Sequence, residues 1–128
     1  MKTILYLLVI TFSFHLYAGP IESLLEVLDV GTHEGRTDDG GRCSVEINKI
    51  GTSKIRVYLT NPRIFQFEFD DQASVEATSQ VLRISGPTIY EDNAEITTTL
   101  VVDGKSVGFE RKFCTYKCWV SIRPCLLY

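Results

Sequence analysis

The chain has few of the residues that carry catalytic chemistry. It contains two histidines, His15 and His33, and neither a Gly-x-Ser-x-Gly motif nor a His-Glu-x-x-His motif is present. A serine or cysteine triad would need His33 as its base, and no partner for it is marked by the sequence. We therefore expect His33 to be an exposed strand residue, and we predict that the protein is not an enzyme and uses no cofactor.

The chain also lacks a run of basic residues. Its 13 Lys and Arg residues and 16 Asp and Glu residues are interleaved and give a net charge of -3. A basic stripe is the usual mark of a nucleic-acid-binding protein, and a polybasic cluster is typical of binding to a membrane surface. We expect no nucleic-acid partner and, after cleavage of the leader described next, no membrane anchor.

Long apolar runs are absent except at the N-terminus. Lys2 precedes the apolar stretch Ile4–Phe12, His15 interrupts it, and Ala18 is small. This pattern is typical of a secretory signal peptide cleaved after Ala18. The apolar stretch is too short for a membrane-spanning helix, which needs about 20 apolar residues. The sequence therefore predicts a signal peptide at 1–18 and a single domain at 19–128 that is secreted or periplasmic.

Cysteine is scarce, and its placement is uneven. An even number in a short exported chain predicts two disulfides, with three possible connectivities; the residues are Cys43, Cys114, Cys118 and Cys125. Because three of them lie close to the C-terminus, at least one bridge must be local. Cys114 and Cys118 are separated by three residues, whereas a thioredoxin-type redox motif has two. A zinc site needs four ligands, His33 is the only histidine after residue 18, and exported thiols usually oxidise. We predict structural disulfides and no metal site.

One short helix is expected at the start of the domain. Pro20 suits the first helical turn, where its missing N–H would be unpaired in any case. An apolar face with helical spacing is formed by Ile21, Leu24, Leu25 and Leu28. About two turns persist only if this face is packed. The alternative is a strand that begins at Val27.

Alternating apolar and polar residues dominate the rest of the chain. The segments 43–48, 55–60 and 65–70 each show the pattern of a half-buried strand. Shorter strands are expected at 81–84 and 118–122, and a long turn or short helix at 70–80. About eight short strands with frequent turns predict an all-β, mainly antiparallel fold, either a small closed barrel or a sandwich.

Two hairpins determine which charged residues face the core. Asp103-Gly104 predicts a type I′ turn with Val102 opposite Lys105, which places Arg111 on an apolar face opposite Ile96. A second hairpin turns within 37–41, at Asp39-Gly40 or Gly40-Gly41. Either turn places Thr32, Glu34 and Arg36 on the same face as Cys43, Val45 and Ile47.

A charge on an apolar face has to be paired or to reach water. Glu34, Arg36 and Arg111 are therefore the candidate ligand-binding residues, with an arginine at a cavity mouth holding an anionic group. The structural alternative is a salt bridge from Glu34 to an arginine at one end of the barrel, or side chains that reach the rim.

Two exposed segments are the candidate partner-binding surfaces. The first is the 37–41 loop, and the second is the C-terminal segment with its aromatic residues. The candidate residues are Asp38, Asp39, Tyr116, Trp119 and Tyr128. The aromatic residues of the C-terminal segment are equally compatible with filling the barrel bottom. The spacing around Asp38-Asp39 and Asp70-Asp71 does not fit a calcium-binding EF-hand loop.

Two functions remain open. The first is a non-catalytic domain that engages a protein partner, with hydrolase inhibition as one form, and it predicts a closed, side-chain-filled interior. The alternative is a barrel that carries a small apolar or amphipathic ligand near Arg36 and Arg111. This carrier predicts an internal void of ligand size and a gain in stability when the ligand binds.

Overall fold

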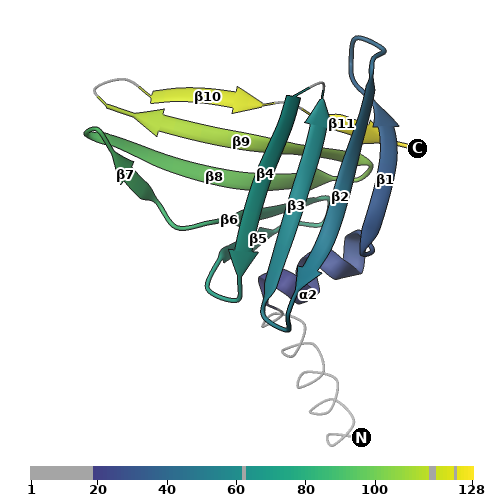
Figure 1. Ribbon diagram of the computed structural model, residues 1–128, viewed down its shortest axis with the longest axis horizontal. Helices are drawn as coiled ribbons and strands as arrows, with labels where there is room; N and C mark the ends of the chain where they lie inside the picture. The colour runs from purple at the N-terminus through teal and green to yellow at the C-terminus, as the bar shows by residue number, and fades with distance from the viewer. Residues whose placement is uncertain (1–18, 62, 116–117, 123) are drawn as a thin grey trace, which may run out of the picture.

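The strands form one antiparallel sheet that curls into a half-barrel, as the computed structural model shows (Figure 1). The structure describes residues 19–61, 63–115, 118–122 and 124–128. The signal peptide predicted at 1–18 lies outside these residues. Within them, no helix is long and apolar enough to cross a membrane.

The short helix α2 is followed by strands only. Their bounds are α2 Pro20–Val27, β1 Gly31–Arg36, β2 Arg42–Ile50, β3 Lys54–Asn61, β4 Arg63–Asp70, β5 Ser74–Ala77, β6 Val81–Ser85, β7 Ile89–Glu91, β8 Ala94–Asp103, β9 Ser106–Cys114, β10 Cys118–Ile122 and β11 Cys125–Leu127. The all-β expectation is confirmed. The expectation of only a turn or helix at 70–80 is wrong, because β5 lies there, and the short strands β7 and β11 were not foreseen.

The sheet has two ends rather than a closed ring. Its strand order is β4-β3-β2-β1-β11-β9-β8-β6-β5, with β10 added to β9 and β7 added to β8. Among the described residues, no backbone pairing joins β4 to β5, which are the two ends of this order. The strong curl is present, but the predicted closed barrel is not confirmed.

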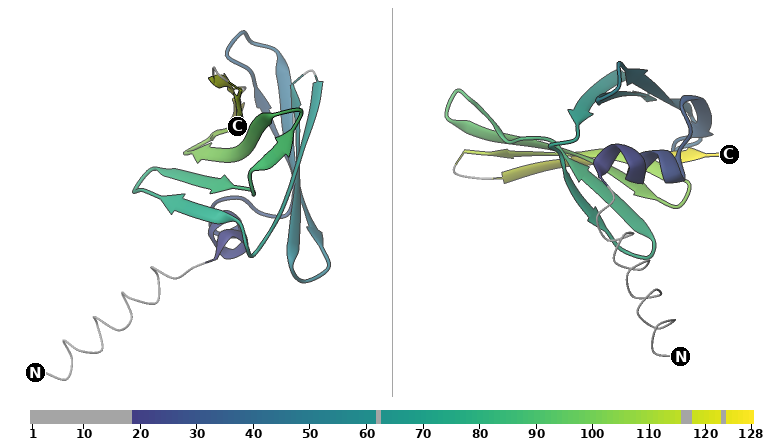
Figure 2. Two further views of the ribbon diagram at one scale, coloured as in Figure 1. Left: turned by 90° about the vertical axis from the view of Figure 1, so that its left-hand side faces the viewer. Right: turned by 90° about the horizontal axis from the view of Figure 1, so that it is seen from below.

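Helix α2 forms where the sequence predicts it. Pro20 occupies the first helical turn, and Leu24 is fully buried in the interior. The helix contacts β5 and β6, and it lies across one end of the curled sheet (Figure 2). Its two turns are therefore held by packing, as their length requires.

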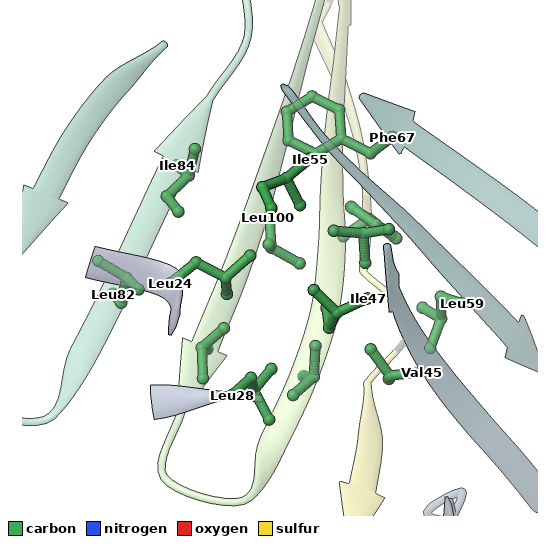
Figure 3. Packing of buried hydrophobic residues seen from close by; sticks show 14 of the residues in the cluster. Leu24, Leu28, Val45, Ile47, Ile55, Leu59, Phe67, Leu82, Ile84 and Leu100 are labelled. Atoms are coloured by element: carbon green, nitrogen blue, oxygen red, sulfur yellow. The ribbon is translucent and has the colours of Figure 1, made fainter. Parts of the chain in front are cut away.

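The core fills the concave side of the sheet close to α2. Figure 3 shows Leu24 from the helix meeting Ile55 and Leu100 from distant strands. The ring of Phe67 on β4 also contacts the ring of Phe109 on β9 edge to face, with 5.7 Å between centroids. The predicted inward residues of β2, β3 and β4 are thus confirmed as core, except that Phe65 is only partly buried.

Strands β8 and β9 form a long hairpin whose two halves pair with different neighbouring strands. Their halves near the turn lie between β6 and β11, whereas their far halves lie between β7 and β10. We call the four-stranded far part, made of β7, 94–98, 110–114 and β10, the distal ribbon. It extends past β4, away from the helix (Figure 1).

The Asp103-Gly104 turn is displaced by one residue. The two central residues are Gly104, with φ +59°, and Lys105, since Asp103 pairs with Ser106. A glycine with positive φ at the first central position is the requirement of a type II′ turn. The predicted register is therefore wrong by two residues, and Arg111 lies opposite Thr98 instead of Ile96. A shift of two preserves the faces, so Arg111 does lie on the apolar face.

In the hairpin that turns within 37–41, the register differs from the predicted one by an odd number of residues. Residues 37–41 form the connection, and Arg36 pairs directly with Arg42. The Thr37 hydroxyl accepts from the N–H of Gly41 at 2.8 Å and stabilises this longer loop. An odd shift exchanges the two faces of a strand. Glu34 and Arg36 therefore lie on the outer face, and the prediction that they point inward is wrong.

Two disulfides join distant and neighbouring parts of the sheet. Cys43 on β2 pairs with Cys125 on β11, with a Cα–Cα distance of 5.9 Å. Cys114 and Cys118 pair locally across the β9–β10 connection. The prediction of two bridges, one of them local, is confirmed, and the structure selects one connectivity from the three.

Candidate functional site

An apolar pocket lies where β3 and β4 face the β8–β9 hairpin. Its volume is about 150 Å³, and it is open on one side. The lining residues are Leu59, Phe65, Gln66, Thr98, Phe109, Arg111 and Phe113. Because these residues come from segments that are far apart in the sequence, the pocket exists only once the sheet has curled.

Arg111 is the charged residue of this pocket. Its Nε donates to the hydroxyl of Thr98 at 3.4 Å, and its guanidinium carbon lies 5.8 Å from the centre of the Phe113 ring. No aspartate or glutamate occurs among the described lining residues. Its side chain is exposed at the mouth, whereas Phe109, on the same face of β9, is buried.

Strand alternation explains this combination of residues. Phe109, Arg111 and Phe113 share one face of β9, because successive side chains of a strand point to opposite faces. The remaining lining residues come from β3 (Leu59), β8 (Thr98) and β4 (Phe65 and Gln66), and β4 crosses over β9 (Figure 1). The pocket therefore joins a cation to phenyl rings, and it can hold an apolar group that carries a negative charge.

The other two candidate ligand residues lie elsewhere. Glu34 and Arg36 line a second, polar recess of about 590 Å³ on the outer side of β1 and β2. Arg36 Nε donates to the hydroxyl of Tyr128 at 2.9 Å. The predicted grouping of these residues with Arg111 around one cavity is wrong, because the 37–41 loop inverts the faces of β1. The salt bridge suggested for Glu34 is not formed among the described residues.

The candidate partner residues have separate environments. Asp38 is exposed in the 37–41 loop, and the Asp39 carboxylate accepts from the Thr37 hydroxyl. Tyr128 is 71% exposed and does not fill the interior. Tyr116 lies outside the described residues. The backbone of Trp119 pairs with Phe113 in the β9–β10 register, and its side chain lies outside the described part.

His33 is half-buried, so the prediction of an exposed histidine is wrong. It lies opposite Val45 on the inner side of β1, and its Nε2 is 2.8 Å from the carbonyl oxygen of Asp29. Among the described residues, no group of three or more His, Cys, Asp or Glu side chains is placed to hold a metal ion.

One charged cluster lies on the outer face, away from the pocket. Arg56 donates from Nε and Nη2 to Glu68, each at 3.1 Å, and Lys54 also pairs with Glu68. The hydrogen bond to Glu68 is the main cause of a raised pKa of Arg56. This cluster strengthens the pairing of β3 with β4 and takes no part in the pocket.

Several pocket residues were not predicted as site residues. The sequence treats Leu59 and Phe65 as inward core residues, and it places Gln66 on the polar side of its strand. Their role depends on β4 crossing β9, which is a contact between residues more than 40 positions apart. Only Arg111 carried a usable signal, because a charge interrupts an apolar face.

No family model matches the chain, and neither the curated proteins nor the solved structures contain a match.

Proposed function

We propose that the protein is a non-catalytic binding domain for a small amphipathic anion, held in the Arg111 pocket. The observation that carries this proposal is the guanidinium of Arg111, which forms no ion pair with the residues that the structure describes and lies beside phenyl rings in a partly enclosed space. The sequence leaves a protein-binding domain and a ligand carrier as the two possible functions, and only the carrier predicts a cavity for a ligand.

The size of the pocket limits the ligand. An apolar cavity of about 150 Å³ is large enough to bind benzene. The rings of Phe65, Phe109 and Phe113 offer edges and faces to an aromatic or short aliphatic group. The open side allows an attached carboxylate to remain near solvent, where Arg111 donates charge-assisted hydrogen bonds.

A matched pair of ligands tests this proposal. We would titrate the disulfide-bonded protein with 3-phenylpropionate and with its uncharged amide, and follow both by NMR. Arg111→Gln removes the cation. Lys112→Gln is the control, because Lys112 neighbours Arg111 on β9 but lies on the opposite face.

We expect the acid to bind more tightly than the amide. Arg111→Gln should weaken binding of the acid by about tenfold or more, because hydrogen bonds to charged groups contribute about 1.5–3 kcal/mol. Lys112→Gln should leave it unchanged. Equal binding of the acid by the Arg111→Gln and Lys112→Gln proteins would contradict the proposal.

A protein partner is the second candidate, including the hydrolase-inhibitor form. It is favoured by β4, which pairs only with β3 among the described strands, and by the exposed part of the distal ribbon. Ile89, Ile96 and Phe113 pair in one register row across the ribbon, and Ile89 is 57% exposed. A partner strand added to β4 would cover this row. Native mass spectrometry of protein purified from its own host separates the two: a small-molecule adduct favours the carrier, and a co-purifying protein favours the partner.

We also propose that the domain acts outside the cytoplasm. Two disulfides are compatible with an oxidising compartment, and the sequence of residues 1–18 supports export. Secretion and periplasmic location are both consistent with these features. Detection of a mature chain beginning at Gly19 in the extracellular or periplasmic fraction would test cleavage after Ala18.

A further inference from the structure

Two arginines lie directly opposite each other at the loop end of the β1–β2 hairpin, where they flank the 37–41 connection. Arg36 is the last residue of β1, Arg42 is the first residue of β2, and the two are directly opposite in the register. Directly opposed like charges destabilise a sheet. Among the described residues, neither arginine forms an ion pair that would offset this repulsion.

Tyr128 holds one of these arginines in place. Its hydroxyl accepts from Arg36 Nε at 2.9 Å, and its ring centre lies 6.0 Å from the guanidinium carbon. This bond uses only the Nε–H, and the four terminal N–H groups of Arg36 donate to no other residue in the described part of the chain, so they can bind an acceptor. The N–H of Tyr128 also donates to the carbonyl oxygen of Glu34 at 3.1 Å, which fixes the tyrosine against β1.

A disulfide fixes the strands that surround the two arginines. The Cys43–Cys125 disulfide joins β2 to β11 immediately beside Arg42 and three residues before Tyr128. The recess between these elements, about 590 Å³, also contains the hydroxyl groups of Ser44 and Thr60. These groups offer further hydrogen-bond donors close to the two cations.

We propose that this recess binds a tetrahedral oxyanion, a phosphate or sulfate group, between Arg36 and Arg42. Four oxygens can accept from both guanidinium forks and from a hydroxyl, and the bound charge would offset the repulsion between the arginines. Glu34 lines the same recess and opposes the anion. The recess is larger than one such ion, so it leaves room for the polar molecule that carries the group.

Titration with the simple ions tests this site separately from the Arg111 pocket. We would add sodium sulfate, and in a second series sodium phosphate, to the disulfide-bonded protein at constant ionic strength, and follow the side-chain Nε–H signals of Arg36 and Arg42 by NMR. The variants are Arg36→Gln, Arg42→Gln, Glu34→Gln and Tyr128→Phe. Arg63→Gln is the control, because Arg63 is an exposed arginine at the start of β4.

We expect saturable binding that Arg42→Gln weakens by about tenfold or more. Tyr128→Phe should weaken it less, because the cation remains but is no longer oriented. Glu34→Gln should strengthen it, and Arg63→Gln should leave it unchanged. Tighter binding in one series than in the other identifies the preferred ion. A response that does not saturate, or that is equal in the Arg42→Gln and Arg63→Gln proteins, would overturn the proposal.

Discussion

Gly35 has no room for a side chain. A Cβ atom at this position would meet the carbonyl group of Leu126 and the Sγ of Cys125, where β11 passes β1. The absence of a side chain is therefore what allows the C-terminal strand to dock and the Cys43–Cys125 bridge to form beside it.

We expect Gly35→Ala to lower the free energy of unfolding by about 1–3 kcal/mol, the usual cost of forcing atoms into a packed site. Thr32→Ala on the same strand is the control, because Thr32 is exposed. Urea unfolding monitored by circular dichroism measures both. Equal stability of the two variants would mean that β11 does not pack this closely against β1.

At the same scale, sequence reasoning predicts the strand face correctly for one of the three candidate ligand residues. Arg111 was placed on the apolar face because alternation along a single strand is a local property. Arg36 and Glu34 were misplaced, since their faces depend on the number of residues in the 37–41 loop. The lining residues of β4 were missed because no local pattern reports that one strand crosses another.

Among the elements, long strands with strict alternation could be predicted, whereas the shortest strands could not. Strands β2, β3 and β4 each alternate over eight or nine residues. Strands β7 and β11 contain three residues each, which is too few to show a period. The turn at Gly104-Lys105 shows a further limit, because Asp-Gly can occupy more than one position in a two-residue turn.

The distal ribbon differs from the rest of the sheet because none of its described residues is fully buried. The near halves of β8 and β9, in contrast, carry the buried residues Leu100, Val102 and Val107. Stability is therefore expected to vary along these two strands.

Amide hydrogen exchange tests this gradient within one strand. We expect the hydrogen-bonded amides of 94–98 to exchange at least tenfold faster than those of 99–103, because local opening of the ribbon exposes less apolar surface than opening of the core. The comparison uses β8 alone, so both halves share the same chain and solvent. Uniform protection along β8 would indicate that the ribbon is covered in solution.

At the scale of the whole molecule, the sequence predicts the fold class but not its closure. Alternation determines that one face of the sheet is buried, and the cysteine pattern predicts two bridges. Closure would require pairing between β4 and β5, the two ends of the strand order. Whether they meet depends on how strongly the sheet curls and on the position of β11 between β1 and β9. Neither property has a local sequence signal.

The two disulfides should contribute unequally to stability. Cys43 and Cys125 are 82 positions apart in the sequence, whereas Cys114 and Cys118 are 4 positions apart. The loop-entropy relation gives about 4.5 kcal/mol for the long loop and about 2 kcal/mol for the short one. We expect the Cys43→Ser, Cys125→Ser double variant to unfold at a clearly lower urea concentration than the Cys114→Ser, Cys118→Ser variant. The reverse order would mean that the local bridge holds structure that the long one does not.

The long bridge also makes most of the chain part of one covalent ring. All strands from β3 to β10 lie between Cys43 and Cys125. A single nick by a protease at any exposed turn in this interval would therefore leave the two fragments joined through sulfur. Only reduction after the cut would release them, so the domain can tolerate a broken backbone in surroundings that contain proteases.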